Sequence, residues 1–297
     1  MTDTATPATD EYEVVARRNP WQTVATVLLA LFVVYATWAV ATNPHFEWGV
    51  VAQWLTARTM ALGALLTVGL TVVSMVLGVI LGVILAVMRM SGNPLLSSVS
   101  GAYIWFFRGT PLLIQLIFWF NLSALVPVLR IGLPLGGPTL YEGSVNSLVT
   151  PLFAALLGLT LNEAAYMAEI VRGGLLGVDR GQTEAASALG LGSGRTLWRI
   201  ILPQAMRIIV PPTGNQVISM LKNTSLVSVL GVGELLHSAQ IVYSRTFQTI
   251  PLLIVASLWY LLMTTILGIG QRYLERHFGR GQEHSSTPRR RKKKVTA

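Results

Sequence analysis

The sequence predicts an all-α membrane protein, a polytopic transmembrane helical bundle with about six spans and both termini in the cytoplasm. Of its 297 residues, 52% are apolar and only 12% are charged, whereas an average soluble domain is about 25% charged. Several uncharged stretches are long enough to cross the hydrocarbon core, which takes about 20 apolar residues. Lys and Arg gather in alternate loops, as they do in membrane proteins with a defined orientation.

Uncharged stretches place five of the predicted spans. They cover residues 21–40, 59–88, 109–129, 143–162 and 246–271. We expect a sixth span at 208–236, which is mostly apolar although it contains Pro211, Pro212 and Lys222. A sixth crossing is needed to keep the charge distribution consistent.

Counting Lys and Arg fixes the predicted topology. With the N-terminus inside and six spans, 18 of the 22 basic residues, Arg108 among them, fall on the inside. Three fall outside, and Lys222 remains within a span. This asymmetry follows the positive-inside rule. We therefore expect a disordered cytoplasmic leader at 1–20, an uncleaved transmembrane anchor at 21–42, and a cytoplasmic C-terminus.

The C-terminal segment 281–297 is predicted to be a basic, disordered tail. Six consecutive basic residues at 289–294 supply most of the net charge of +9. The high pI therefore reflects a tail that is solvated or faces anionic lipid, and we expect no nucleic-acid partner. The chain has no Cys, which excludes disulfide frameworks, Cys-ligated zinc and thiol nucleophiles.

Charged residues inside spans are rare and usually functional. Glu169 lies three residues before Arg172, so a local ion pair is expected there. Glu163 has no cation nearby in the sequence. It either pairs with Lys222 or acts with it as the two charges that a zwitterionic solute requires. The polar residues that follow Lys222 either join helices or line a pathway. The candidate substrate-pathway residues are Glu163, Lys222, Asn223 and Thr224.

The loop at 176–206 is long for a connector and has its own predicted helix. Asp179 can cap the start of this helix, with Gln182 in the capping-box position. Gly190 can end it in a left-handed conformation. The side chains between them are mostly small, so this helix can fit closely into a groove of a partner.

Glu184-Ala185-Ala186, Gly190 and Leu202-Pro203 have the full spacing of the EAA signature, and this loop resembles that of bacterial ABC importer permeases. The segments 107–113, 164–174 and 222–226 are similar to those of polar amino-acid permeases in the same superfamily. The resemblance covers residues 57–276, taken as the permease domain with its coupling loop at 176–206. The anchor at 21–42 is additional to the five-span form of the family.

The resemblance implies a transport subunit, not an enzyme, in a bacterial cytoplasmic (inner) membrane. The implied partners are a second permease, identical or related, a cytoplasmic ABC ATPase dimer, an extracytoplasmic binding protein and an amino-acid substrate. The expected ATPase-coupling residues are Gln182, Glu184, Ala185, Ala186, Gly190, Leu202 and Pro203. No cofactor is expected on this chain, because a P-loop needs a Lys after Gly and none of its four lysines follows a glycine.

Two other functions remain open from the sequence. One is an ABC permease for a solute other than an amino acid, since the EAA signature is shared across substrate classes. The other is an ion-gradient-driven secondary transporter, in which Glu163 would bind the coupling ion and Pro211-Pro212 would break a helix. The gradient-driven alternative leaves the coupling loop unexplained.

Overall fold

We describe a computed structural model of the chain that covers residues 20–132 and 139–278. The chain divides into two compact units, Met1–Trp48 and Gly49–Ala297, and each is described by itself. The predicted tail at 281–297 and all of the predicted leader except Pro20 lie outside the described residues.

The first unit is dominated by helix α1 (Pro20–Thr42), which corresponds to the predicted anchor. Its 23 residues contain no charge and extend about 35 Å, enough to cross a hydrocarbon core of about 30 Å. A short 3₁₀ turn, η1 (Pro44–Phe46), follows. The Trp48 indole N–H donates to the Val40 carbonyl at 3.2 Å and so fixes the turn at the end of α1.

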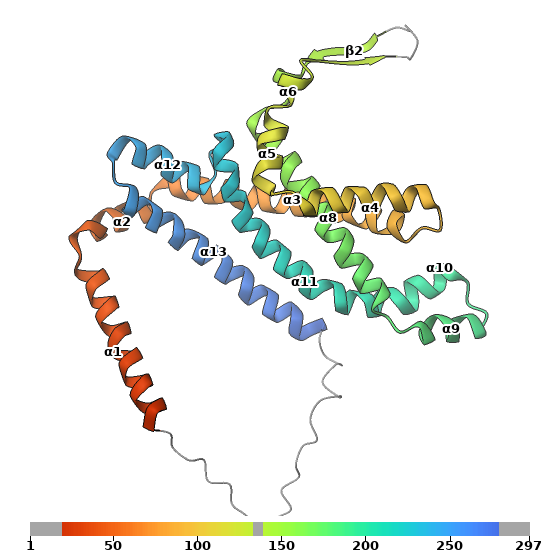
Figure 1. The fold of residues 1–297 in the computed structure, drawn as a ribbon, viewed down its shortest axis with the longest axis horizontal. Coiled ribbons are helices and arrows are strands. Elements are labelled where there is room, and N and C mark those ends of the chain that lie inside the picture. Colours follow the sequence, from red (N-terminus) through yellow and green to blue (C-terminus); the bar gives the residue numbers. More distant parts are fainter. Residues whose placement is uncertain (1–19, 133–138, 279–297) are drawn as a thin grey trace, which may run out of the picture. The chain divides into compact units, whose positions relative to one another are not determined.

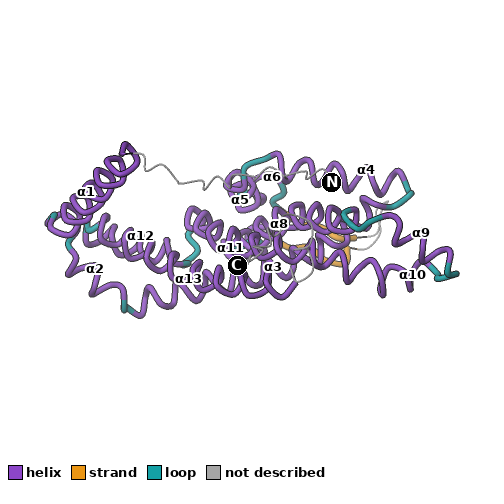
Figure 2. The backbone as a smooth tube through the Cα atoms, turned by 90° about the horizontal axis from the view of Figure 1, so that it is seen from below, coloured by secondary structure: helices purple, strands orange, loops and turns teal. Residues whose placement is uncertain are grey.

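The second unit contains the remaining elements, which are almost all helices joined by short loops (Figures 1 and 2). In chain order they are α2 (Trp48–Leu55), α3 (Arg58–Met90), α4 (Pro94–Gly109), α5 (Leu112–Phe120), α6 (Leu122–Leu125), β1 (Val128–Gly132), β2 (Thr139–Ser144), α7 (Val145–Leu148), α8 (Pro151–Leu176), α9 (Arg180–Ala188), α10 (Ser193–Thr196), the π-helical turn η2 (Leu197–Ile201), α11 (Leu202–Asn223), the 3₁₀ turn η3 (Thr224–Leu230), α12 (Leu235–Thr246) and α13 (Thr249–Phe278).

Helices α3 and α8 pack against each other in parallel at the centre of this unit. Two glycines of α3 make the close approach possible. A Cβ atom added at Gly78 would lie 2.8 Å from Glu163 Cγ, and one at Gly82 would lie 2.6 Å from Met167 Cβ. The spacing of these glycines predicts a close helix contact of this kind, and the structure confirms it.

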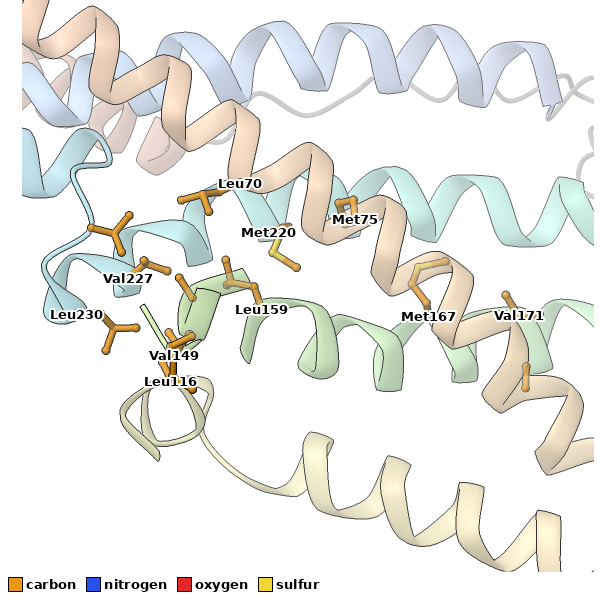
Figure 3. Close-up of a cluster of buried hydrophobic side chains, with 14 of the residues drawn as sticks. Leu70, Met75, Leu116, Val149, Leu159, Met167, Val171, Met220, Val227 and Leu230 are labelled. Carbon is orange, nitrogen blue, oxygen red and sulfur yellow. The ribbon is translucent and has the colours of Figure 1, made fainter. Parts of the chain in front are cut away.

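The core consists of two clusters of buried apolar side chains. The first joins α3, α5, α8, α11 and η3, and Figure 3 shows Leu159 of α8 among Leu116, Met220 and Val227. The second joins the start of α3 to α12 and α13. Most of the other large apolar side chains are exposed, which suits surfaces that face lipid or a partner chain.

The helices agree with the predicted number of spans. Four of them, α1, α3, α8 and α13, are long and apolar enough to cross a membrane. Two bent pairs bring the number to six if each counts as one span. The first is α4 with α5, bent by 103°, and the second is the segment Ser193–Leu230 with α12, bent by 44°.

Two predicted spans differ from the structure in their position. The stretch 109–129 is not one helix, because the chain breaks at Thr110-Pro111 and α5 ends at Phe120. The span expected at 143–162 is displaced toward the C-terminus, because α8 begins only at Pro151, after Thr150 accepts a hydrogen bond from the Phe153 amide. The helix therefore includes Glu163 and Glu169.

The sequence did not indicate the antiparallel hairpin formed by β1 and β2, in which Val128 pairs with Ser144 and Arg130 with Glu142. Figure 1 shows the hairpin beyond α6, near the start of α8, while α9 lies at the other end of α8. The hairpin carries Arg130, which the charge count places outside, and α9 carries Arg180, which it places inside. By this count, helix α8 connects the two sides of the membrane.

Candidate functional site

The break between α4 and α5 is maintained by side chains that replace a missing backbone donor. In a continuous helix the amide of residue 111 would bond to the Phe107 carbonyl, but Pro111 has no N–H. Gln115 Nε2 and Asn162 Nδ2 donate to this carbonyl instead, each at 3.0 Å. The bend is therefore satisfied by hydrogen bonds within the protein, as backbone groups at membrane depth require.

These two amides also bond to each other and to the residue at the bend. Asn162 Nδ2 lies 3.2 Å from Gln115 Oε1, and Gln115 Nε2 donates to Thr110 Oγ1 at 2.7 Å. Both amide side chains are buried. The network fixes the position of the α4–α5 break relative to α8, and so determines the shape of the space beside it.

A cavity of about 500 Å³ opens beside this break, between α4, α5, α8 and α11. Its lining is predominantly polar, in contrast to the surrounding helices. The lining residues are Arg108, Gly109, Thr110, Pro111, Leu112, Asn162, Glu163, Tyr166, Gln216, Ser219 and Asn223. Cavities that bind small molecules commonly have volumes of about 300–1,000 Å³.

Glu163 lines this cavity and has one buried carboxyl oxygen without a partner in the described part of the chain. Its side chain lies against Gly78 and the residue is only 3% exposed. Oε1 has no hydrogen-bond partner among the residues that the structure describes. Burying an unpaired polar group is costly. This oxygen has almost no exposed surface, so a donor in the cavity reaches it only when the side chain turns toward the cavity.

Arg108 supplies the opposite charge. Its guanidinium lies 5.4 Å from the ring centroid of Tyr166, within cation–π distance. Its Nη1 is 3.9 Å from Glu169 Oε2, while Glu169 also accepts two bonds from Arg172, at 2.8 and 3.2 Å. The predicted Glu169–Arg172 pair is therefore present. Arg108 lies in the last turn of α4, next to the break, whereas the sequence count assigned it to a cytoplasmic loop.

The structure brings two of the four predicted pathway residues, Glu163 and Asn223, to the cavity. Lys222 is exposed and Thr224 is fully buried, with its hydroxyl donating to the Leu221 carbonyl at 2.7 Å. Neither belongs to the lining. Within residues 20–132 and 139–278 no ion pair joins Glu163 to Lys222. A pathway role for Lys222 and Thr224 stays a prediction.

Sequence reasoning missed most of the other polar residues of the cavity. One signal was present, because Gln216, Ser219 and Asn223 have the three- and four-residue spacing that places side chains on one face of a helix. Asn162 and Tyr166, one turn apart on α8, gave a weaker signal of the same kind. Among the described residues no group of three His, Cys, Asp or Glu side chains could hold a metal ion.

The helix predicted in the long cytoplasmic loop is present as α9, and both of its ends have the predicted capping residues. Asp179 Oδ1 accepts from the Gly181 amide at 2.7 Å, which caps the N-terminus. Gly190 has a φ of 73°, and the Leu191 amide bonds to the Ala186 carbonyl at 3.0 Å. This arrangement is the Schellman form of helix ending.

The expected coupling residues lie on α9 and at the start of α11. Ala186 is buried on the inner side of α9, whereas Glu184 and Ala185 are exposed. Gln182 Oε1 does not complete the predicted capping box but accepts from Gln204 Nε2 of α11 at 3.3 Å. Gln204 follows the expected coupling residues Leu202 and Pro203. This bond links α9 to the helix that lines the cavity.

Residues 78–280 match the family described as binding-protein-dependent transport system inner membrane component. The arginine transport system permease protein ArgU of Corynebacterium glutamicum is 45% identical over 275 residues, which are 92% of this chain and 84% of ArgU. The glutamine transport system permease protein GlnP of Escherichia coli is 32% identical over 78% of this chain and 97% of its own length. The crystal structure of an amino acid ABC transporter with histidines superposes with a TM-score of 0.64 at 32% identity, covering 74% of this chain and 94% of that chain.

Proposed function

The chain belongs to the family of binding-protein-dependent transport system inner membrane components, and on that premise we propose that it is the permease through which a polar amino acid enters the cell. It is a multi-pass membrane protein and a transport subunit. In this proposal it forms the pathway with a second permease, identical or related. A separate ATPase dimer supplies the energy, and an extracytoplasmic binding protein delivers the amino acid.

The observation that carries the proposal is that a carboxyl group and a guanidinium line the same cavity. Glu163 lines the cavity with a carboxyl group, one oxygen of which has no partner among the described residues, and Arg108 lines it with a guanidinium that has five N–H donors. A free amino acid is a zwitterion and needs a partner for each charge. Asn223 and Ser219 add hydrogen-bonding groups at the same cavity. A neutral sugar or an inorganic anion would leave at least one of these charges without a partner.

The relatives favour the same class of solute. ArgU is named for arginine and GlnP for glutamine, and the related solved structure is that of an amino acid transporter. The cavity suits the zwitterionic part that all these amino acids share, and of the two named relatives ArgU has the higher identity to this chain, 45% against 32%. We therefore take arginine as the first substrate to test.

The coupling step is proposed to pass through α9. Glu184, Ala185 and the 79%-exposed Leu189 face outward from this helix and are available to the ATPase. The Gln182–Gln204 bond connects α9 to α11, and α11 carries Gln216, Ser219 and Asn223 along the cavity. A displacement of α9 on ATP binding would therefore be transmitted to the wall of the cavity.

Uptake into proteoliposomes that contain the full chain with its ATPase tests the proposal. The binding protein and radiolabelled arginine are added outside, with ATP enclosed or omitted. We expect uptake that needs ATP and survives collapse of the ion gradients. Glu163→Gln should lower uptake by roughly tenfold or more, since a hydrogen bond to a charged group contributes about 1.5–3 kcal/mol.

Glu275→Gln is the matched control, because Glu275 of α13 lies outside the cavity and its bond with Gln271 is one that glutamine can still accept. Both variants should still co-purify with the ATPase. Normal arginine uptake by Glu163→Gln would contradict the assignment of the cavity. Uptake driven by an ion gradient without ATP would overturn the proposed mechanism.

A further inference from the structure

A second, apolar groove of about 530 Å³ lies on the part of the fold that faces the cytoplasm. It is bounded by the C-terminal halves of α3 and α8, by η2 and α11, and by the end of α13. Val83, Met167, Met206, Val210 and Leu274 are among its lining residues, and nearly all the others are also apolar. A groove of this composition excludes water and polar solutes, so the amino-acid pathway does not explain it.

The groove has the length of a lipid tail. Along α11 its lining runs from Leu202 to Val217, which is about 22 Å at 1.5 Å per residue. One leaflet of the hydrocarbon core is about 15 Å deep, half of the roughly 30 Å of the bilayer interior. The groove can therefore hold one acyl chain along its full depth in a leaflet.

The cytoplasmic end of the groove carries an aromatic side chain of the kind found at membrane interfaces. Trp198, in the π-helical turn η2, lines the groove and is 70% exposed. Trp residues are enriched at the level of the lipid headgroups. Its neighbour Leu197 is also largely exposed. This end of the groove therefore has the character of the boundary between acyl chains and headgroups.

Arginines without acidic partners are close in the chain to the residues that line this end. Arg195 and Arg199 lie on either side of Leu197 and Trp198, and Arg207 follows Met206. All three arginines are exposed, and none of them forms an ion pair within residues 20–132 and 139–278. Basic pockets between transmembrane helices on the cytoplasmic side suit anionic headgroups.

We propose that this groove binds an anionic phospholipid of the cytoplasmic leaflet, with one acyl chain along α11 and the headgroup at Arg195 and Arg199. An anionic lipid fits this site better than a protein partner does. Its headgroup would complement the charge of the arginines, and its acyl chain would follow the groove along the parts of α3 and α8 that lie in the hydrocarbon core. The outward surface of α9, by contrast, is polar and small and suits a soluble ATPase.

Mass spectrometry of the intact full chain, released from detergent, measures this binding directly. The chain is titrated separately with phosphatidylglycerol and phosphatidylcholine that carry the same acyl chains. We expect phosphatidylglycerol to bind about thirtyfold more tightly, the preference that two arginines near an anionic headgroup provide. The double variant Arg195→Gln/Arg199→Gln should lose this preference. Arg58→Gln, an exposed arginine at the start of α3 on the opposite side, should keep it.

A second variant tests the apolar part of the groove. Val210→Trp fills the groove and should weaken the binding of both lipids equally, while circular dichroism verifies that the variant keeps its helix content. Equal affinity of the unmodified chain for the two lipids would overturn the proposal. An unchanged preference for phosphatidylglycerol in the double arginine variant would also overturn it. The same holds for a Trp198→Ala variant that no longer co-purifies with the ATPase but binds phosphatidylglycerol normally, because this surface would then be the docking site of the ATPase.

Discussion

The Glu163 side chain of α8 lies directly against Gly78 of α3, and a Cβ atom at position 78 would come within 2.8 Å of Glu163 Cγ. Contacts this short do not occur between real side chains, so one of the two helices or the carboxylate would have to move. The position of the cavity carboxylate thus depends on a glycine in another helix, 85 positions earlier in the chain.

Gly78→Ala is expected to impair uptake even though position 78 does not line the cavity. The added methyl group would displace Glu163 and separate α3 from α8, an overpacking that typically costs about 1–3 kcal/mol. Gly69→Ala is the matched control, because nothing lies within 4 Å of a Cβ at this position of the same helix. Its thermal stability should be equal or slightly higher, since Ala is the better helix former. Equal stability and uptake in the two variants would contradict the role assigned to the contact.

The amide network at the helix break gives a second prediction. Gln115→Met keeps the volume of the side chain but removes the donor to the Phe107 carbonyl and to Thr110. Removing a partner from a buried polar group costs about 1–3 kcal/mol, so the midpoint of thermal unfolding in detergent should fall. Adding Pro111→Ala to this variant restores a backbone N–H near Phe107 and should recover part of the loss. A double variant that is less stable than Gln115→Met alone would argue against this explanation.

The sequence was sufficient for a bundle of up to six spans and for helix α9 with its two ends, because both depend on local patterns. Charge-free stretches and the cap and glycine of α9 are features of short segments. The cavity depends on a tertiary contact instead. Asn162 reaches the Phe107 carbonyl from a helix 55 residues away. Pro111 is a local signal for the break itself, but no local pattern indicates which side chains meet there.

Lys222 and Thr224 illustrate the same limit. They adjoin Asn223 in the sequence, and a polar cluster within a span predicts a pathway for all three. On a helix, however, neighbouring residues point in different directions. Only Asn223 shares the cavity face with Ser219 and Gln216, so helical spacing is a better guide than adjacency.

Gly190 gives a prediction about coupling to the ATPase. Its φ of 73° lies in the left-handed region, where a residue with a Cβ costs about 1–2 kcal/mol. Gly190→Ala should therefore loosen the end of α9 and reduce both co-purification with the ATPase and its stimulation by loaded binding protein. Gly192→Ala is the control, since Gly192 has a φ of −68° and free space around its Cα. Equal ATPase retention in both variants would show that the conformation of Gly190 does not matter for docking.

Glu234 anchors the start of α12 and leads to the last prediction. This carboxylate is fully buried, caps α12 through the His237 amide at 2.7 Å, and accepts from the Tyr260 hydroxyl of α13 at 2.7 Å. Tyr260→Phe should lower the free energy of unfolding by about 1–3 kcal/mol, because it takes a donor from a buried polar group. Glu234→Ala should cost more, since the helix cap is lost as well. In the Glu234→Ala background Tyr260→Phe should have little further effect, and this non-additivity is measured by a double-mutant cycle.

Tyr273→Phe, at a position that is 76% exposed on the same helix, should leave stability unchanged. Additive losses at Glu234 and Tyr260 would mean that the two side chains stabilise the fold independently, and that α12 is held to α13 by its apolar contacts alone.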